Sequence, residues 1–225
     1  MTSAMQAPGP SAPSAPTTLY ARVLKRGCDV VVASVLLVLA LPVMALVAAA
    51  VRVVLGPPVL FRDERAGVGG VPIQIAKFRS MSQATDASGL PLPDSDRLGA
   101  FGRALRRTSL DELPQLFSVL RGDMSLIGPR PLPMRYVPRY NPRQAVRLGV
   151  RPGLTGWAQV NGRNAVAWPE RLELDVQYVE MLGRPSAPAT DLWIAAVTAC
   201  QLVSQSITGR GIAAPGAATM QEFAP

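Results

Sequence analysis

The feature that most constrains this chain is Val30 to Val51, a run of 22 residues without a charged side chain. As a straight helix rising about 1.5 Å per residue, it would be roughly 33 Å long, enough to cross the ~30 Å hydrocarbon core of a bilayer. The whole chain agrees, since its mean hydropathy is +0.21 and only 17% of its residues are charged, against a usual ~25%. The sequence therefore predicts contact with a membrane.

Two details bear on how this run meets the membrane. Pro42 lies near its middle and frees the carbonyl of Val38 from hydrogen bonding, so a kink is expected. Basic residues flank both ends, with Arg22, Lys25 and Arg26 before the run and Arg52 and Arg62 after it. The positive-inside rule, applied to both flanks, favours a hairpin that enters and leaves on the cytoplasmic face. Composition alone favours a spanning helix, then a re-entrant helix, then a cleaved signal peptide, which the Pro-rich lead fits poorly.

The remaining sequence predicts short elements between two tails. Residues 1–18 are rich in Pro, Ala, Ser and Thr and are expected to be disordered, as is the end of the chain from 208. Strands are expected at 59–61 and 73–78 around a turn at 67–70, followed by a loop at 82–95. Helices are expected at about 96–106, 113–120, 169–182 and 190–205, the last capped by Thr190 and able to lie on the membrane interface.

The charge balance favours anionic partners. The net charge is +8, which suits phospholipid head groups, nucleic acid or phosphorylated substrates. Nucleic acid is the weaker choice, because the few aromatic residues do not interleave with arginines and no nucleic-acid-binding signature is present.

The chain contains no histidine and two cysteines, Cys28 and Cys200. Without histidine, Ser-His-Asp and Cys-His mechanisms and His-ligated metal sites are excluded. Two cysteines so far apart do not make a disulfide framework, so a reducing compartment is permitted. Any catalysis must therefore use carboxylates, lysine, tyrosine, a thiol or a hard metal held by oxygen.

The segment TSLDELPQL, residues 108–116, holds two adjacent carboxylates, Asp111 and Glu112. Ser109 and Glu112 match a capping box, in which Asp111 would interact favourably with the helix dipole. Pro114 suits the first helical position, which would instead place both carboxylates just before the helix, where a phosphate is also attracted. Spacing alone favours the structural interpretation.

Basic residues in short Gly/Pro-framed segments change that balance. They are Lys77 and Arg79 in KFRSM, Arg130 in GPRP, Arg151 in RPG and Arg163 in NGR. Each arginine taken alone is best interpreted as a structural ion pair, but arginines also bind phosphates bidentately on rigid backbone. Several such segments beside one acidic pair favour a diphosphate site with Mg²⁺ held by carboxylate oxygen.

The sequence resembles the bacterial sugar transferases, specifically the small monotopic phosphoglycosyl transferases. The matching stretches are KRGCDVVVASVLLVLALPVMAL, GPPVLFRDERAG, KFRSM, RRTSLDELPQLFSVLRGDMSLIGPRP, RPGLTGWAQVNGRN and ERLELDVQYVE. They run from about 25 to 180, and LDELPQ together with DMSLIGPRP is very specific.

The resemblance implies transfer of a sugar-1-phosphate from a UDP-sugar to polyprenyl (undecaprenyl) phosphate, releasing UMP, as the start of membrane glycan assembly. Asp111 matches the nucleophile that forms a covalent phosphosugar intermediate, and Glu112 matches its partner, both beside Mg²⁺. The implied substrate-binding residues are Lys77, Arg79, Pro129, Arg130, Pro131 and Arg163. A carboxylate is a competent nucleophile toward phosphorus, and no histidine is needed.

The resemblance also implies an α+β fold, with a small mixed α/β catalytic domain, an N-terminal re-entrant membrane helix and amphipathic interfacial helices. The expected divisions are a tail at 1–18, the membrane helix at 19–55, a catalytic domain at 56–207 on the cytoplasmic face of the bacterial inner membrane, and a tail at 208–225. The family breaks its membrane helix at a Ser-Pro pair, and Leu41-Pro42 stands there in this chain. A second departure is Arg147, near which many relatives have histidine.

The expected partners are a UDP-sugar, polyprenyl phosphate and inner-membrane lipid, with a second copy of the chain as a further candidate and no nucleic acid. Two other functions compete with the enzyme. One is a non-catalytic membrane-bound scaffold of a glycan assembly complex, and the other is a soluble nucleic-acid binder. The intact carboxylate pair and its basic neighbours argue against the scaffold, and Val30–Val51 argues against the soluble protein.

Overall fold

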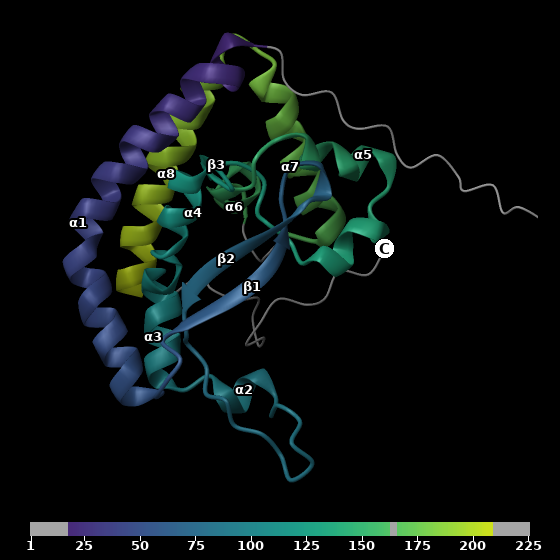
Figure 1. Cartoon of the computed structure of the whole chain (residues 1–225). Coiled ribbons are helices and arrows are strands. Elements are labelled where there is room, and N and C mark those ends of the chain that lie inside the picture. Colours follow the sequence, from purple (N-terminus) through teal and green to yellow (C-terminus); the bar gives the residue numbers. More distant parts are fainter. Residues whose placement is uncertain (1–17, 163–165, 209–225) are drawn as a thin grey trace, which may run out of the picture.

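The computed structural model describes residues 18–162 and 166–208, and helices dominate it (Figure 1). The helices are α1 (Lys25–Val54), α2 (Asp94–Arg97), α3 (Ala100–Thr108), α4 (Gln115–Arg121), α5 (Pro142–Ala145), α6 (Trp157–Val160), α7 (Trp168–Leu182) and α8 (Ala187–Thr208). A π-helical turn, Tyr20–Leu24, precedes α1, and 3₁₀ turns form at Val68–Gly70, Leu110–Glu112, Met134–Arg139 and Val146–Gly149. The predicted tails fall mostly on 1–17 and 209–225, outside the described residues.

In the described part of the chain, four strands form two small sheets. Strands β1 (Leu60–Ala66) and β2 (Pro72–Phe78) pair antiparallel, with Phe61 opposite Lys77. The predicted hairpin is confirmed and is longer than expected on its first strand. Its turn uses Gly69 and Gly70, whose φ angles of 65° and 76° favour glycine. Strands β3 (Ser125–Ile127) and β4 (Gly153–Thr155) pair in parallel. The mixed helix-and-sheet class predicted from the sequence is therefore confirmed.

Helix α1 continues without interruption through Leu41 and Pro42, so the break expected at this pair is not seen. Pro42 still removes the hydrogen bond that Val38 would accept. The helix is held on either side of that gap by packing against the rest of the protein, with Ala33 in one core cluster and Val47 in another. With the turn before it, the helix extends over Tyr20–Val54, 35 residues with a mean hydropathy of 3.0 in its most apolar part, and is long and apolar enough to cross a membrane.

One face of α1 is buried along the molecule. Its buried residues are Lys25, Asp29, Ala33, Met44, Val47 and Val51, at helical spacing. Ala33 packs with Leu116, while Val51 packs with Phe78 and Leu105. Both ends of the helix therefore contact the same folded unit. The opposite side remains exposed and apolar, with Val31 at 64% and Val38 at 67% exposure.

A cluster around Asp191, hereafter the Asp191 cluster, joins the two ends of the chain. The Asp191 carboxylate accepts hydrogen bonds from Tyr20 Oη at 2.7 Å and Lys25 Nζ at 2.8 Å on one oxygen, and from Tyr178 Oη at 2.9 Å on the other. Asp191 is buried, so its charge is compensated inside the protein by Lys25. The start of α1, the end of α7 and the start of α8 are thus fixed to one another.

The predicted helix at 96–106 is two helices, because the chain leaves helical conformation at Leu98 and Gly99. Gly102 then allows α3 to approach the segment after β2 closely: a side chain there would place its first carbon 1.8 Å from the Ser80 carbonyl oxygen. Helix α7 matches its predicted bounds within one residue.

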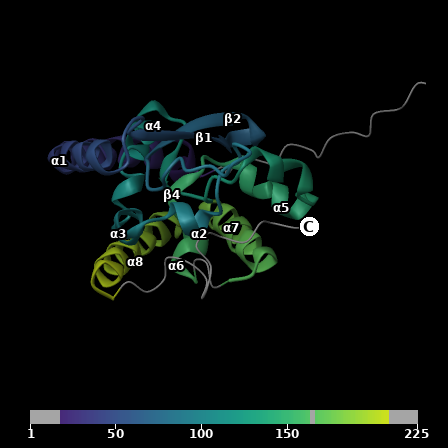
Figure 2. The same ribbon diagram turned by 90° about the horizontal axis from the view of Figure 1, so that it is seen from below.

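Helix α8 begins at Ala187, three residues earlier than predicted. Thr190 therefore lies inside the helix, where its hydroxyl donates to the Ser186 carbonyl, and the predicted cap at Thr190 is wrong. Figure 1 shows α1 and α8 running in the same direction along one side of the molecule, and Figure 2 shows that they lie apart, with α3 between them.

Candidate active site

The carboxylate pair lies in the 3₁₀ turn Leu110–Glu112, just before α4. The capping box predicted at Ser109 is wrong: Ser109 adopts a left-handed conformation with φ 55°, and its side chain makes no capping hydrogen bond. Helix α4 starts directly after Pro114, which itself has helical backbone angles. The alternative in which Pro114 shifts the helix start past both carboxylates is therefore confirmed.

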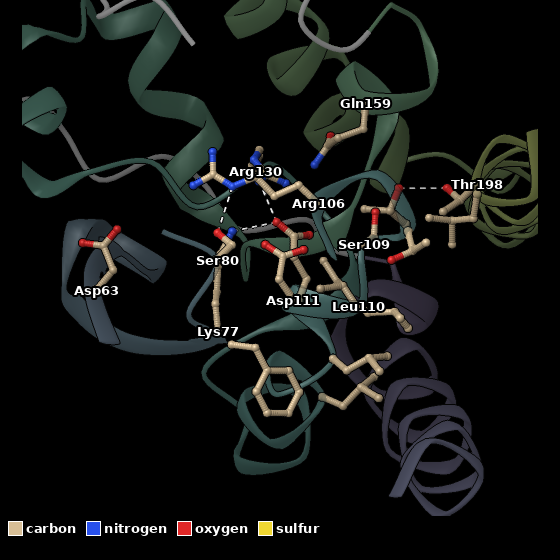
Figure 3. Close-up of a pocket in the computed structure, with 18 of the residues that line it drawn as sticks. Asp63, Lys77, Ser80, Arg106, Ser109, Leu110, Asp111, Arg130, Gln159 and Thr198 are labelled. Atoms are coloured by element: carbon tan, nitrogen blue, oxygen red, sulfur yellow. Dashed lines mark hydrogen bonds and ion pairs between the residues drawn. The ribbon is translucent and has the colours of Figure 1, made fainter. Parts of the chain in front are cut away.

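Glu112 is held by two cations from distant parts of the chain. Its Oε1 lies 2.6 Å from Lys77 Nζ on β2 and 2.9 Å from Arg130 Nη2 in the GPRP segment. Burial alone would raise the pKa of Glu112, but the charges of Arg130 and Lys77 hold it well below its usual range. Glu112 is therefore ionised at neutral pH. Figure 3 shows these contacts converging beside Asp111.

Asp111 differs from its neighbour in having no such partner. It is 7% exposed, and within the described part of the chain no side chain or backbone group donates a hydrogen bond to it. Burial, and then the negative charge of Glu112, raise the pKa of Asp111 to about 6. Two adjacent carboxyl groups with pKa values shifted in opposite directions are typical of a reacting pair. The oxygens of Asp111 face the cavity and are available for chemistry or for a metal.

The GPRP segment is held by backbone hydrogen bonds and by a second arginine. The Pro129 carbonyl accepts from the backbone N–H of Gly153 at 2.8 Å, and the Pro131 carbonyl accepts from Arg65. The Arg130 carbonyl accepts from Arg147 Nη2. These contacts fix the direction in which the Arg130 side chain leaves the backbone.

Arg147 forms a buried ion pair with Asp175 on α7. Its Nη2 lies 2.8 Å from Asp175 Oδ2, and each side chain is 2% exposed. This arginine thus connects α7 to the backbone of the GPRP segment. The second oxygen of Asp175 is buried and has no hydrogen-bond partner among the described residues.

One predicted substrate-binding residue, Arg79, stands apart from this cluster. Arg79 borders the same cavity, but its guanidinium donates to the backbone carbonyls of Leu55, Gly56 and Pro57, after the end of α1. Arg163 lies outside the described residues. Lys77, Arg130 and the carboxylate pair are brought together, while a contact between Arg79 and substrate stays a prediction.

Two further cavity residues were not among the predicted site residues. Arg106 on α3 donates from Nε to Ser80 Oγ at 2.9 Å and lies close enough to Asp111 to lower its pKa, against the larger effect of burial. Gln159 on α6 has both amide atoms buried and without hydrogen-bond partners in the described part of the chain. Figure 3 shows its side chain extending into the cavity above Arg106. Arg106 lies five residues before Asp111 in the sequence, and this proximity was a signal by which it could have been predicted as a site residue.

The residues present fit a Mg²⁺ ion that shares its coordination with a substrate. Among the described residues there is no cluster of three or more Asp, Glu, Cys or His side chains. Asp111 and Glu112 alone would be a weak site for the metal, but Mg²⁺ is usually bound through one or two carboxylates together with phosphate oxygens and water. The unpartnered carboxylate of Asp111 meets this requirement.

The comparisons with known proteins agree on one family. Residues 20–205 match the family described as bacterial sugar transferase. An uncharacterized sugar transferase of Bacillus subtilis, EpsL, is 49% identical over 158 residues, covering 70% of this chain and 78% of that protein. The UDP-glucose:undecaprenyl-phosphate glucose-1-phosphate transferase of Caulobacter vibrioides is 42% identical over 166 residues, covering 69% of this chain and 62% of that protein.

A third relative acts on a different sugar according to its name. It is the UDP-N-acetylgalactosamine-undecaprenyl-phosphate N-acetylgalactosaminephosphotransferase of Aeromonas hydrophila, 35% identical over 204 residues. The match covers 87% of this chain and 46% of that protein. The match thus spans about half to three-fifths of the length of these last two relatives, whose names state their substrates.

Proposed function

The chain belongs to the bacterial sugar transferase family, and we propose that it transfers a sugar-1-phosphate from a UDP-sugar to polyprenyl (undecaprenyl) phosphate and releases UMP. Relatives named for this kind of transfer support the substrate classes. The observation that carries the proposal is the contrast within the pair: Glu112 is held by two cations, while the buried carboxylate of Asp111 is unpartnered and faces the cavity.

The chemistry would proceed in two displacements at the sugar-bearing phosphorus of the donor. A carboxylate oxygen of Asp111 attacks that phosphorus, the bond to the bridging oxygen breaks, and UMP leaves with the electron pair. A phosphate oxygen of the acceptor then attacks the same phosphorus and releases the Asp111 carboxylate. The product is the sugar joined to the polyprenyl group through a diphosphate.

The neighbouring residues suit this reaction. Lys77 and Arg130 bring two positive charges next to Asp111, where they would offset charge on the diphosphate and in the transition state. Glu112 holds both cations in place, and its negative charge contributes to the raised pKa of Asp111. Asp111 must lose its proton to act, so the donor and its cations would have to favour the ionised form.

Mg²⁺ is the proposed cofactor. Asp111 and Glu112 would hold it, together with donor phosphate oxygens. When bound, it would neutralise charge on the transferred phosphoryl group.

We also propose that α1 is embedded in the bacterial inner membrane with both of its ends, and the catalytic domain, on the cytoplasmic face. The contacts of α1 support this placement, because Lys25 near its start and Val51 near its end pack on the same folded unit. The basic residues Arg22 and Arg52 on both flanks support it as well.

The test is UMP release by the purified full chain. Wild-type protein in detergent is given a panel of UDP-sugars with undecaprenyl phosphate and Mg²⁺, and we expect release with at least one sugar. Asp111→Asn should abolish release with that same pair while the variant still unfolds in a cooperative thermal transition. Equal activity of the variant and the wild type would remove Asp111 as the nucleophile, and inactivity of the wild type across the panel would overturn the function.

A further inference from the structure

The cavity at Asp111 extends between α1 and α8, and one face of each helix lines it. Its apolar lining residues are Val32, Leu36, Leu39, Ala40 and Val43 from α1, and Leu192, Ala195, Ala199 and Leu202 from α8. Both sets recur at spacings of three and four residues, which marks a single face of each helix. We call this space the α1–α8 groove. Leu39 and Leu192 are 68% and 73% exposed, so core side chains do not fill it.

The floor of the groove combines small and positively charged side chains. One face of α3 lines it, with Ala100, Arg103, Ala104, Arg107 and Thr108. Arg103 donates to the Leu98 carbonyl at 2.7 Å. Arg107 is exposed, and within the described ranges no hydrogen bond or ion pair engages its guanidinium. The groove therefore has apolar walls and an available cation.

The groove leads to the proposed nucleophile. Leu110, Leu113 and Leu116 continue its apolar lining, and Leu110 directly precedes Asp111. Along α1, the lining from Val32 to Val43 extends about 16 Å at ~1.5 Å per residue, close to half of the ~30 Å hydrocarbon core. An apolar path about as long as one leaflet is thick thus runs along α1 to the reacting carboxylate.

We infer that the α1–α8 groove binds the isoprenoid chain of the acceptor, which enters sideways from the membrane, and that Arg107 attracts the acceptor phosphate. The inference rests on the proposed function and adds where its lipid substrate lies. An amphiphile with one anionic end matches apolar walls that surround an arginine-bearing floor. The small side chains of Ala195 and Ala199 leave room for such a chain.

The experiment fills the groove and measures the two substrates separately. Ala195→Trp and Ala199→Trp place a bulky ring on the lining face of α8, and Ala196→Trp is the matched control, since Ala196 is exposed on the same helix but does not line the cavity. We expect KM for undecaprenyl phosphate to rise about tenfold or more in the two groove variants and to stay within about twofold in the control. KM for the UDP-sugar should stay within about twofold in all three.

Two further comparisons test the isoprenoid chain and the phosphate of the acceptor separately. A short-chain isoprenyl phosphate should be affected less than undecaprenyl phosphate by Ala199→Trp, because it occupies less of the groove. Arg107→Gln should raise KM for both acceptors and leave KM for the donor unchanged. Ala199→Leu, a smaller substitution, should give an intermediate effect, and it keeps the test available if the tryptophan variants do not fold.

Three results would overturn the inference while wild-type UMP release remains intact. The first is indistinguishable acceptor KM values for Ala195→Trp, Ala199→Trp and the Ala196→Trp control. The second is an equal effect on short and long acceptors, which assigns the groove to bulk phospholipid. The third is a rise in donor KM alone for Arg107→Gln. Absence of wild-type UMP release would instead count against the proposed function.

Discussion

The side chains of Arg147 and Asp175 meet 2.8 Å apart with only 2% of each exposed, and the same guanidinium donates to the backbone carbonyl of Arg130. Removing one partner of such a pair leaves a buried charge uncompensated, at a cost of roughly 3–5 kcal/mol. We therefore expect Arg147→Met to lower the melting temperature sharply and to raise KM for the UDP-sugar, because Arg130 loses its backbone support. The double variant Arg147→Met with Asp175→Leu should recover part of the stability but not of the KM. Recovery of both the stability and the KM would show that the ion pair does not act on the active site through Arg130.

The raised pKa of Asp111 predicts a stability gain from removing its charge. In metal-free protein the pKa is about 6, above the ordinary 3.8, so the contribution of Asp111 to stability is fully present below 3.8 and is lost as the pH rises through 6. At about 1.4 kcal/mol per pKa unit, the loss at pH 8 is roughly 3 kcal/mol. Asp111→Asn should therefore melt at a higher temperature than wild type at pH 8 in EDTA, and the difference should shrink toward pH 4. A pH-independent difference would contradict the assignment.

The planar shape of the Arg130 guanidinium, and not only its charge, is expected to affect kcat. Arg130→Lys keeps the positive charge but replaces a planar group with a point charge, so the contact with Glu112 and the direction toward donor phosphates change together. We expect kcat to fall by about 10²-fold, as when one transition-state donor is lost. Arg121→Lys is the matched control, because Arg121 is exposed and forms its ion pair with Asp123. Similar kcat values for the two variants would show that charge alone is sufficient at position 130.

Gln159 is expected to contact the donor. Both of its amide atoms are buried in the cavity without partners among the described residues, and an unmade buried hydrogen bond costs about 1–3 kcal/mol. A bound UDP-sugar that satisfies them would make Gln159→Leu raise KM for the donor by about tenfold, with acceptor KM unchanged. Inhibition by UMP separates the two ends of the donor: an unchanged inhibition constant places the contact on the sugar, and a weaker one on the nucleotide. Unchanged kinetics throughout would exclude any contact.

The placement of α1 predicts that residues 22 and 52 are labelled from the same side of the membrane. Both native cysteines are exposed, so Arg22→Cys and Arg52→Cys are introduced singly into a background lacking Cys28 and Cys200 whose activity has been verified. In intact cells, a membrane-impermeant maleimide should label neither position, and both should react after the membrane is opened. Labelling of one position alone in intact cells would establish a spanning helix.

The local part of the site could be predicted from the sequence because its determinants are local. Pro114 fixes where α4 begins, which places Asp111 and Glu112 before the helix whatever the tertiary structure. Lys77 and Arg130 were recognisable as basic residues in short rigid segments and as family motifs. Their meeting at one oxygen of Glu112 depends on the fold, and the sequence predicted only that they share a phosphate site with the carboxylate pair.

The long-range part could not be predicted in the same way. Arg147 and Asp175 meet across the packing of α7, although an aspartate three residues after Leu172 and one before Val176, on an otherwise buried face, was a signal of a buried partner. The continuity of α1 was missed because the sequence shows only the local cost of Pro42, the loss of one helical hydrogen bond. The packing of Ala33 and Val47 on either side of Pro42, which holds the helix together, depends on the tertiary structure. Propensity is overridden by such packing.

The Asp191 cluster has a consequence for the order in which the protein matures. Lys25 and Asp191 are separated by 166 positions, which a ribosome adding about 5–20 residues per second covers in roughly 10 to 30 s. Throughout that interval Lys25 lacks the carboxylate that compensates its charge in the folded protein. The parts of α1 that pack with Leu116, Phe78 and Leu105 are followed by these partners much earlier, so the Asp191 cluster is among the last contacts of the fold to form.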